Sequence, residues 1–110
     1  MKEHDDKIPL ERIVESVDAV RRHLAGYDFD AFCKDQKTFD AVLMQIINIG
    51  EMVNRLSEEF RETHNNLPWH KAIGMRNEIA HGYFEIEKKV VWDTAIKDLP
   101  ELKKQLKKLI

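Results

Sequence analysis

Apolar side chains recur every three or four residues between Lys37 and Thr63, and this spacing constrains the fold more than any other feature of the chain. Such a stripe is typical of one helix face that is buried against a core. At 1.5 Å per residue, a single helix over this segment would extend roughly 40 Å, more than a small domain needs across its own width. Gly50 interrupts the stripe and costs about 1 kcal/mol of helix propensity, so we expect another helix to approach closely there.

The same spacing predicts further helical segments on both sides, and no segment alternates between apolar and polar residues as a half-buried strand does. We expect helices or helical turns over residues 9–26, 27–36, 68–82 and 87–110. In the last of these, Asp98 is expected to cap a kinked or restarted helix, and Glu101 to return the hydrogen bond as in a capping box. The sequence therefore predicts an all-α fold, an antiparallel bundle of four or five helices.

The composition is that of a soluble, helix-rich globular protein, with 43% hydrophobic and 35% charged residues. Residues 1–110 fit a single domain, and a domain of this size leaves apolar surface that a second copy would cover, so we expect a homodimer. Cys33 is the only cysteine, and the N-terminus has no apolar run that would serve as a secretory signal. We therefore expect a cytoplasmic protein without a membrane span.

The charge pattern gives no broad attraction for a polyanion, because the net charge is −2 and the pI is about 6.2. Four lysines gather near the C-terminus: Lys103, Lys104, Lys107 and Lys108. On a helix they form the solvated face opposite three leucines, which is the simplest interpretation, although a contact with RNA stays open. If RNA is the substrate, local groups must bind it.

Those local groups are found near the end of the fourth helical segment, where Arg76, Asn77, His81 and Tyr83 surround a glycine break at Gly82. A guanidinium binds phosphate, an imidazole moves protons near neutral pH, and a phenol offers a hydroxyl. On a helix, Arg76 and His81 are separated by about 140° and by roughly 7.5 Å along the axis. Two copies related by a twofold axis would bring one Arg76 toward the other His81, which predicts a composite cleft in a homodimer.

These side chains suit cleavage of RNA, which carries its own nucleophile in the 2′-hydroxyl. The reaction then needs a proton-transfer group and a positive charge on the phosphate, requires no metal, and leaves a 2′,3′-cyclic phosphate. Asn77 would orient His81 or bind the ribose phosphate. His64 and His70 have no third ligand at convincing spacing, so we expect neither a zinc site nor another cofactor.

Four stretches occur in the order found in HepT-type HEPN ribonucleases, and the C-terminal half of the chain resembles that family: Leu67-Pro68-Trp69, Gly74-Met75-Arg76-Asn77, His81-Gly82-Tyr83-Phe84, and Val91-Trp92 with Asp98-Leu99-Pro100. The resemblance implies a HEPN-like helical domain. It also implies a metal-independent endoribonuclease with Arg76 and His81 as catalytic residues and Asn77 in support.

By the same resemblance, the chain would be the toxin of a type VII-like toxin–antitoxin pair. Its partner would be a nucleotidyltransferase antitoxin with an MNT domain, which silences the toxin by adding AMP to Tyr83 and assembles with the toxin dimer. A bulky anionic nucleotide two residues from His81 would block the cleft and repel RNA phosphates. Two alternatives stay open: a non-catalytic HEPN module that binds a nucleotide or a partner, and a plain helical adaptor.

Overall fold

The computed structural model describes residues 5–110 and consists of helices and their connections, with no strand in that range. The elements are α1 (Lys7–His23), α2 (Phe29–Cys33), α3 (Gln36–Arg55), α4 (Glu58–Thr63), α5 (Trp69–Gly82), a 3₁₀ turn (Tyr83–Glu85), α6 (Lys88–Asp93), a π-helical turn (Thr94–Asp98) and α7 (Leu99–Lys107). The predicted all-α bundle is confirmed. No helix within residues 5–110 combines the length and apolarity that crossing a bilayer requires.

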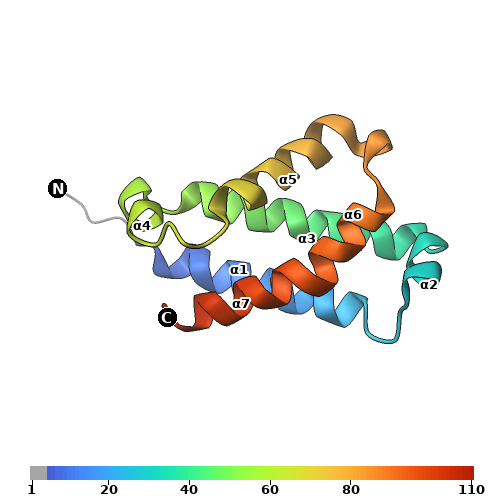
Figure 1. The fold of residues 1–110 in the computed structure, drawn as a ribbon, viewed down its shortest axis with the longest axis horizontal. Coiled ribbons are helices and arrows are strands. Elements are labelled where there is room, and N and C mark those ends of the chain that lie inside the picture. The colour runs from blue at the N-terminus through green and yellow to red at the C-terminus, as the bar shows by residue number, and fades with distance from the viewer. Residues whose placement is uncertain (1–4) are drawn as a thin grey trace.

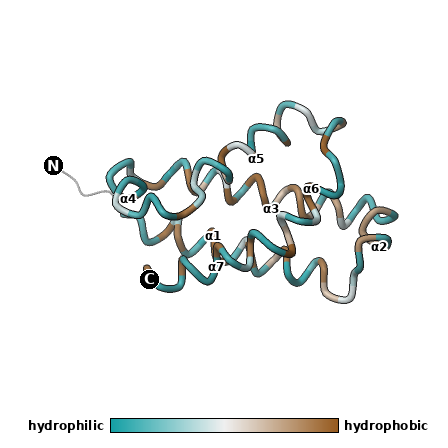
Figure 2. The backbone as a smooth tube through the Cα atoms, in the orientation of Figure 1, coloured by the Kyte–Doolittle hydropathy of each residue, from teal (hydrophilic) through white to brown (hydrophobic). Residues whose placement is uncertain are grey.

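Helix α3 is the centre of the bundle, because α1 packs along one side of it and α5 along another (Figure 1). The segment formed by α6, the π turn and α7 closes the remaining side and packs on α1. In Figure 2 hydrophobic and hydrophilic stretches follow one another along the turns of the helices, as expected of helices with one buried face. The bundle is elongated, with extents of 50 × 28 × 21 Å.

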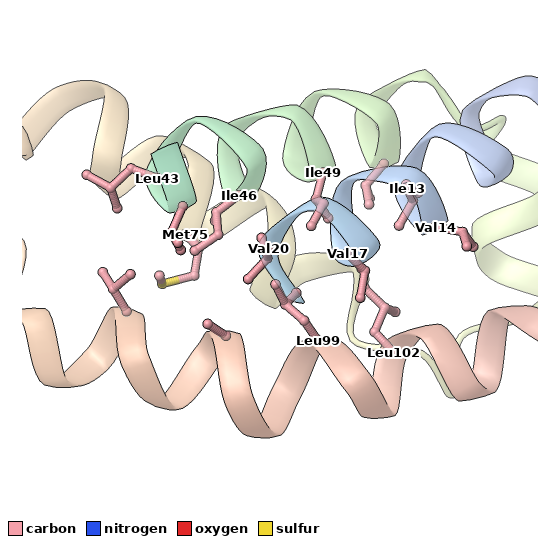
Figure 3. Packing of buried hydrophobic residues seen from close by; sticks show 14 of the residues in the cluster. Ile13, Val14, Val17, Val20, Leu43, Ile46, Ile49, Met75, Leu99 and Leu102 are labelled. Carbon is pink, nitrogen blue, oxygen red and sulfur yellow. The ribbon is translucent and has the colours of Figure 1, made fainter. Parts of the chain in front are cut away.

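The core lies where these helices meet, and Figure 3 shows Met75 of α5 near Leu43 and Ile46 of α3. Phe32, in the single turn of α2, is fully buried and packs against Phe39 in a tilted arrangement, with 5.6 Å between ring centroids. The helical turn predicted within residues 27–36 is therefore confirmed.

The prediction of one continuous helix from Lys37 to Thr63 is wrong, because α3 ends at Arg55 and α4 begins at Glu58. Leu56 and Ser57 are extended, and the Ser57 hydroxyl accepts a hydrogen bond from the Phe60 amide at 3.1 Å, which caps α4. The Asp6 carboxylate accepts bonds from the Ser57 amide at 2.7 Å and its hydroxyl at 2.8 Å. These bonds satisfy polar groups at the break and fix it against α1.

The capping box at Asp98 is also wrong, because the Asp98 side chain makes no capping hydrogen bond. It pairs instead with Lys71 of α5, with 2.8 Å between Nζ and Oδ2. The chain passes from α6 into α7 through a π-helical turn, so the predicted irregularity occurs as a widened turn rather than a restart. A wider turn accommodates Pro100, which has no amide proton and whose ring crowds the preceding turn.

Candidate functional site

Helix α5 and the 3₁₀ turn that follows it carry the four residues singled out in the sequence. The helix starts after Pro68 and ends at Gly82, as predicted, and Tyr83 begins the 3₁₀ turn. Only Trp69, Met75 and Ile79 of α5 are buried, so the rest of the helix presents its side chains to the surface or to the edge of α3. The candidate site therefore lies on a helix that is less buried than α1, α3 and α7.

Arg76 is directed at α3, where its guanidinium forms an ion pair with Glu51. The Arg76 Nη2 lies 2.6 Å from Glu51 Oε1, and its Nε donates to the same oxygen at 2.8 Å. Its Nη1 donates to Asn77 Oδ1 at 3.0 Å. The Asn77 side chain thus orients Arg76 in this structure, and Glu51 is a site residue that sequence reasoning missed.

Gly50 makes this arrangement possible by letting α5 approach α3. A Cβ atom at Gly50 would lie 2.3 Å from the Arg76 Cβ and 3.0 Å from the Ala72 carbonyl oxygen. The predicted close approach of another helix at Gly50 is confirmed, and the approaching residue is Arg76 itself. Packing against glycine therefore fixes the stem of the arginine, while Glu51 and Asn77 hold its charged end.

His81 has different surroundings, because its exposed side chain lines a cleft of about 440 Å³. The walls come from α5, the 3₁₀ turn and the start of α6, and they carry three carboxylates, Glu78, Glu85 and Glu87. A second cleft of about 420 Å³ shares Met75, Glu78 and Val90 with the first, so a groove follows α5 and α6. Within residues 5–110 the His81 imidazole has no hydrogen-bonding partner, which leaves both nitrogens free for a ligand.

Tyr83 is held by the first turns of α3. Its hydroxyl donates to Asp40 Oδ1 at 2.6 Å and accepts from Gln36 Nε2 at 3.0 Å, and Gln36 also donates to Asp40 Oδ1 at 3.0 Å. The hydrogen bond to Asp40, followed by partial desolvation and the charge of Asp40, raises the pKa of the Tyr83 phenol above its usual value. The Tyr83 side chain is 37% exposed, and Phe84 beside it is 96% exposed.

One copy of the chain therefore separates the two groups expected to act on one phosphate. Arg76 is bonded to Glu51 of α3, whereas His81 opens into the cleft bounded by the 3₁₀ turn and α6. This separation agrees with the angular distance expected on a helix.

Other candidate groups lie away from this site. Among residues 5–110, no three His, Cys, Asp or Glu side chains are placed to hold a metal ion. The His64 ring packs at a tilt against Phe60, with 4.5 Å between ring centroids. Lys103 pairs with Asp18 of α1 at 2.6 Å, while Lys104, Lys107 and Lys108 are exposed. The C-terminal lysines thus form a mostly solvated face, as the simplest interpretation of the sequence has it.

Comparison with known proteins adds independent evidence. The family model described as ribonuclease HepT-like matches residues 13–109. A protein named "Putative RNase" from Caldanaerobacter subterraneus subsp. tengcongensis is 36% identical over 92% of this chain and 90% of its own length. A protein named "Probable ribonuclease HepT" from Thermococcus cleftensis is 32% identical over 91% of both chains. No solved structure matches.

Proposed function

Because the chain belongs to the HepT-like ribonuclease family of helical HEPN domains, we propose that it is a metal-independent endoribonuclease that serves as the toxin of a toxin–antitoxin pair. The observation that carries the proposal is the free, exposed imidazole of His81 in an open cleft, on the helix that also presents Arg76. An unpaired imidazole in an open cleft has access to a substrate proton, which is the first geometric requirement of a general acid or base.

In the proposed reaction, His81 accepts the proton of a ribose 2′-hydroxyl as that oxygen attacks the adjacent phosphorus. Arg76 stabilises the charge that develops on the phosphate oxygens, since a guanidinium offers a permanent charge and paired donors. The bond between phosphorus and the 5′-oxygen breaks, that oxygen leaves with the electron pair and takes up a proton to become a 5′-hydroxyl, and the upstream product ends in a 2′,3′-cyclic phosphate. The two nitrogens by which Arg76 now binds Glu51 are the donors that a phosphate would take.

We place the active site between two copies of the chain, because a single copy directs Arg76 and His81 to different surroundings. Three carboxylates surround the His81 cleft, so a phosphate there needs a positive charge from outside it. The edge of α3 and α5 that carries Arg76 also exposes apolar surface: Met44 is 55% exposed, and Ile47 and Ile73 are partly exposed. A homodimer through this edge would cover that surface and bring one Arg76 toward the other His81.

Silencing is proposed to occur at Tyr83, through transfer of AMP by a nucleotidyltransferase antitoxin. The phenol is accessible, and Tyr83 follows directly after Gly82, which lines the His81 cleft. An attached nucleotide adds negative charge beside a cleft that already carries three carboxylates, which strengthens the repulsion of RNA phosphates.

The test is to mix purified Arg76→Ala and His81→Ala chains under conditions that allow subunits to exchange. A mixed dimer would contain one site with both groups intact, so random exchange is expected to restore about a quarter of wild-type cleavage. Mixing His81→Ala with itself is the negative control. His70→Ala is the matched control, since His70 is an exposed histidine at the start of the same helix, and this variant should cleave like wild type.

A mixture that stays inactive, although size measurements show that mixed dimers form, would contradict the composite site. Full activity of either variant alone would contradict the role of that residue. If the wild type also leaves RNA intact, the ribonuclease proposal itself fails, and the site is better explained as one that binds a nucleotide or a partner.

A further inference from the structure

The hydrogen bonds between Tyr83 and α3 hold the side chain in place. They also put two polar groups on the hydroxyl, as nucleotide transfer to a phenol requires. Asp40 and Gln36 lie one helical turn apart on α3 and both reach the same hydroxyl. The phenol directs its proton to Asp40 Oδ1 and takes one hydrogen bond from Gln36 Nε2. The remaining lone pair of the oxygen is not used by either contact, and the side chain is exposed enough for a second protein to reach it.

A tyrosine is a poor nucleophile near neutral pH, since a phenol with a pKa near 10 is ionised in only about one molecule in a thousand at pH 7. In this structure the reactive form is rarer still, because Asp40 places its hydrogen bond and its negative charge against the phenol and raises its pKa. A preformed phenolate is therefore not the route to transfer. The proton must leave while the new bond forms, and the group that already holds that proton is Asp40.

We propose that Asp40 is the general base that accepts the Tyr83 proton when a nucleoside monophosphate is transferred to Tyr83, and that Gln36 positions the phenol oxygen for attack. The inference rests on the proposed modification of Tyr83 and assigns part of its chemistry to the acceptor chain itself. The partner nucleotidyltransferase supplies the nucleoside triphosphate.

The Tyr83 oxygen attacks the α-phosphorus of the nucleoside triphosphate and forms a new P–O bond. The bond between that phosphorus and the β-phosphate oxygen breaks, pyrophosphate leaves with the electron pair, and the phenol proton moves the short distance to Asp40 Oδ1. Asp40 then releases this proton to solvent, and its carboxylate faces a phosphodiester charge without a hydroxyl proton between them, so like charges repel Tyr83 from α3.

The variant that isolates the base is Asp40→Asn, which keeps the shape of the side chain and an oxygen that accepts the tyrosine hydrogen bond but takes up no proton. Asp30→Asn is the matched control, because Asp30 is an exposed aspartate on α2 that pairs with Lys34 and does not contact Tyr83. Each chain is incubated with the purified nucleotidyltransferase partner, ATP and magnesium. Mass spectrometry then follows the initial rate of AMP addition at Tyr83 from pH 6 to pH 9.

We expect Asp40→Asn to slow the addition roughly a hundredfold or more at pH 7, within the range that general bases contribute. Its rate should rise with pH as the phenol ionises without help, so the deficit relative to wild type shrinks toward pH 9. Asp30→Asn should follow the wild-type profile. A second variant, Asp40→Glu, keeps a carboxylate and should recover part of the rate together with a wild-type pH profile, which a purely structural role for Asp40 does not predict.

Two outcomes would overturn the inference in distinguishable ways. If Asp40→Asn binds the partner and is modified at Tyr83 with the wild-type rate and pH profile, Asp40 is not the base, while the proposed silencing stands. If the wild type gains no AMP, or Tyr83→Phe gains as much as the wild type, the modification of Tyr83 fails and the role of Asp40 fails with it.

Discussion

Two tyrosines donate their hydroxyl protons to aspartates at the start of α3, and the two pairs behave differently. Tyr27 bonds Asp35, which also accepts the Thr38 amide at 3.1 Å and the Thr38 hydroxyl at 2.9 Å. Tyr83 donates to Asp40, which also accepts a hydrogen bond from the side-chain amide of Gln36. The Tyr27 bond, followed by those from Thr38, lowers the pKa of Asp35 to about 2, whereas at the second pair the pKa of the Tyr83 phenol is raised.

The difference follows from what surrounds each carboxylate. Asp35 caps α3 and is bound by three donors from nearby residues, so its charge is fixed as part of the fold. Asp40 lies within the helix, makes no cap, and meets a tyrosine 43 positions later in the chain. A tyrosine and an aspartate thus stabilise the fold at Asp35, where several donors bind the carboxylate. At Asp40 the phenol stays exposed, and the same two groups are suited to a reaction at the hydroxyl.

The difference between the two tyrosine–aspartate pairs is tested most directly by removing each hydroxyl in turn. Tyr83→Phe should abolish AMP addition, because the acceptor oxygen is gone, and should leave the melting temperature near that of wild type. Tyr27→Phe should do the opposite, lowering the melting temperature by several degrees with AMP addition intact. Thermal unfolding and mass spectrometry of the two variants measure both effects, and equal loss of stability in both would show that the pairs are alike.

A smaller effect on stability is expected at Gly50, where α5, the helix that leads into Tyr83, packs closely on α3. Gly50→Ala puts a methyl group into the Arg76 stem, so the helices must separate at a cost of about 1–3 kcal/mol despite the gain in helix propensity. Gly74→Ala is the matched control on α5, because a Cβ there meets nothing within 4 Å, and it should stabilise by roughly 1 kcal/mol. Urea unfolding that shows both variants stabilised would contradict the close approach.

The smallest expected effect is a change in stability at acid pH, and it depends on Asp35. The pKa of Asp35 is lower in the folded chain than in the unfolded chain, so its contribution to stability is present above about pH 4 and is lost as the pH falls toward about 2. Asp35→Asn should therefore have a lower melting temperature than wild type at pH 7, and the difference between the two melting temperatures should be smaller at pH 2.5. Melting curves at the two pH values measure it, and a gap that widens in acid would have the wrong sign.

Much of this architecture follows from the sequence because the determinants are local. The period of the apolar residues, together with Gly26 and Gly82, predicts most helix limits. Gly50 lowers helix propensity within α3, and this predicts the close contact of α5 with α3. The break at Ser57 was missed because part of what stabilises it is Asp6, which is 51 positions earlier. At Asp98, the ion pair with Lys71 replaced a cap that the local pattern favours.

The candidate site could likewise be predicted only in part from the sequence. Arg76, His81 and Tyr83 could be selected from their chemistry and spacing, but their partners could not. Glu51 and Asp40 read in the sequence as ordinary polar residues on the outer face of a helix, and only the packing of α5 beside α3 brings them to the motif. The acidic walls of the His81 cleft likewise depend on how the 3₁₀ turn folds back toward α6.

The most direct measurement is the chemistry of RNA 3′ ends after incubation with the purified wild-type chain and with His81→Ala, with and without EDTA. We predict that wild type leaves 2′,3′-cyclic phosphates whether or not EDTA is present, and that His81→Ala cleaves roughly a hundredfold more slowly or worse. Ends with a 3′-hydroxyl, cleavage that requires a metal, or no difference between the two folded chains would contradict the proposal that this helical cleft cuts RNA through His81.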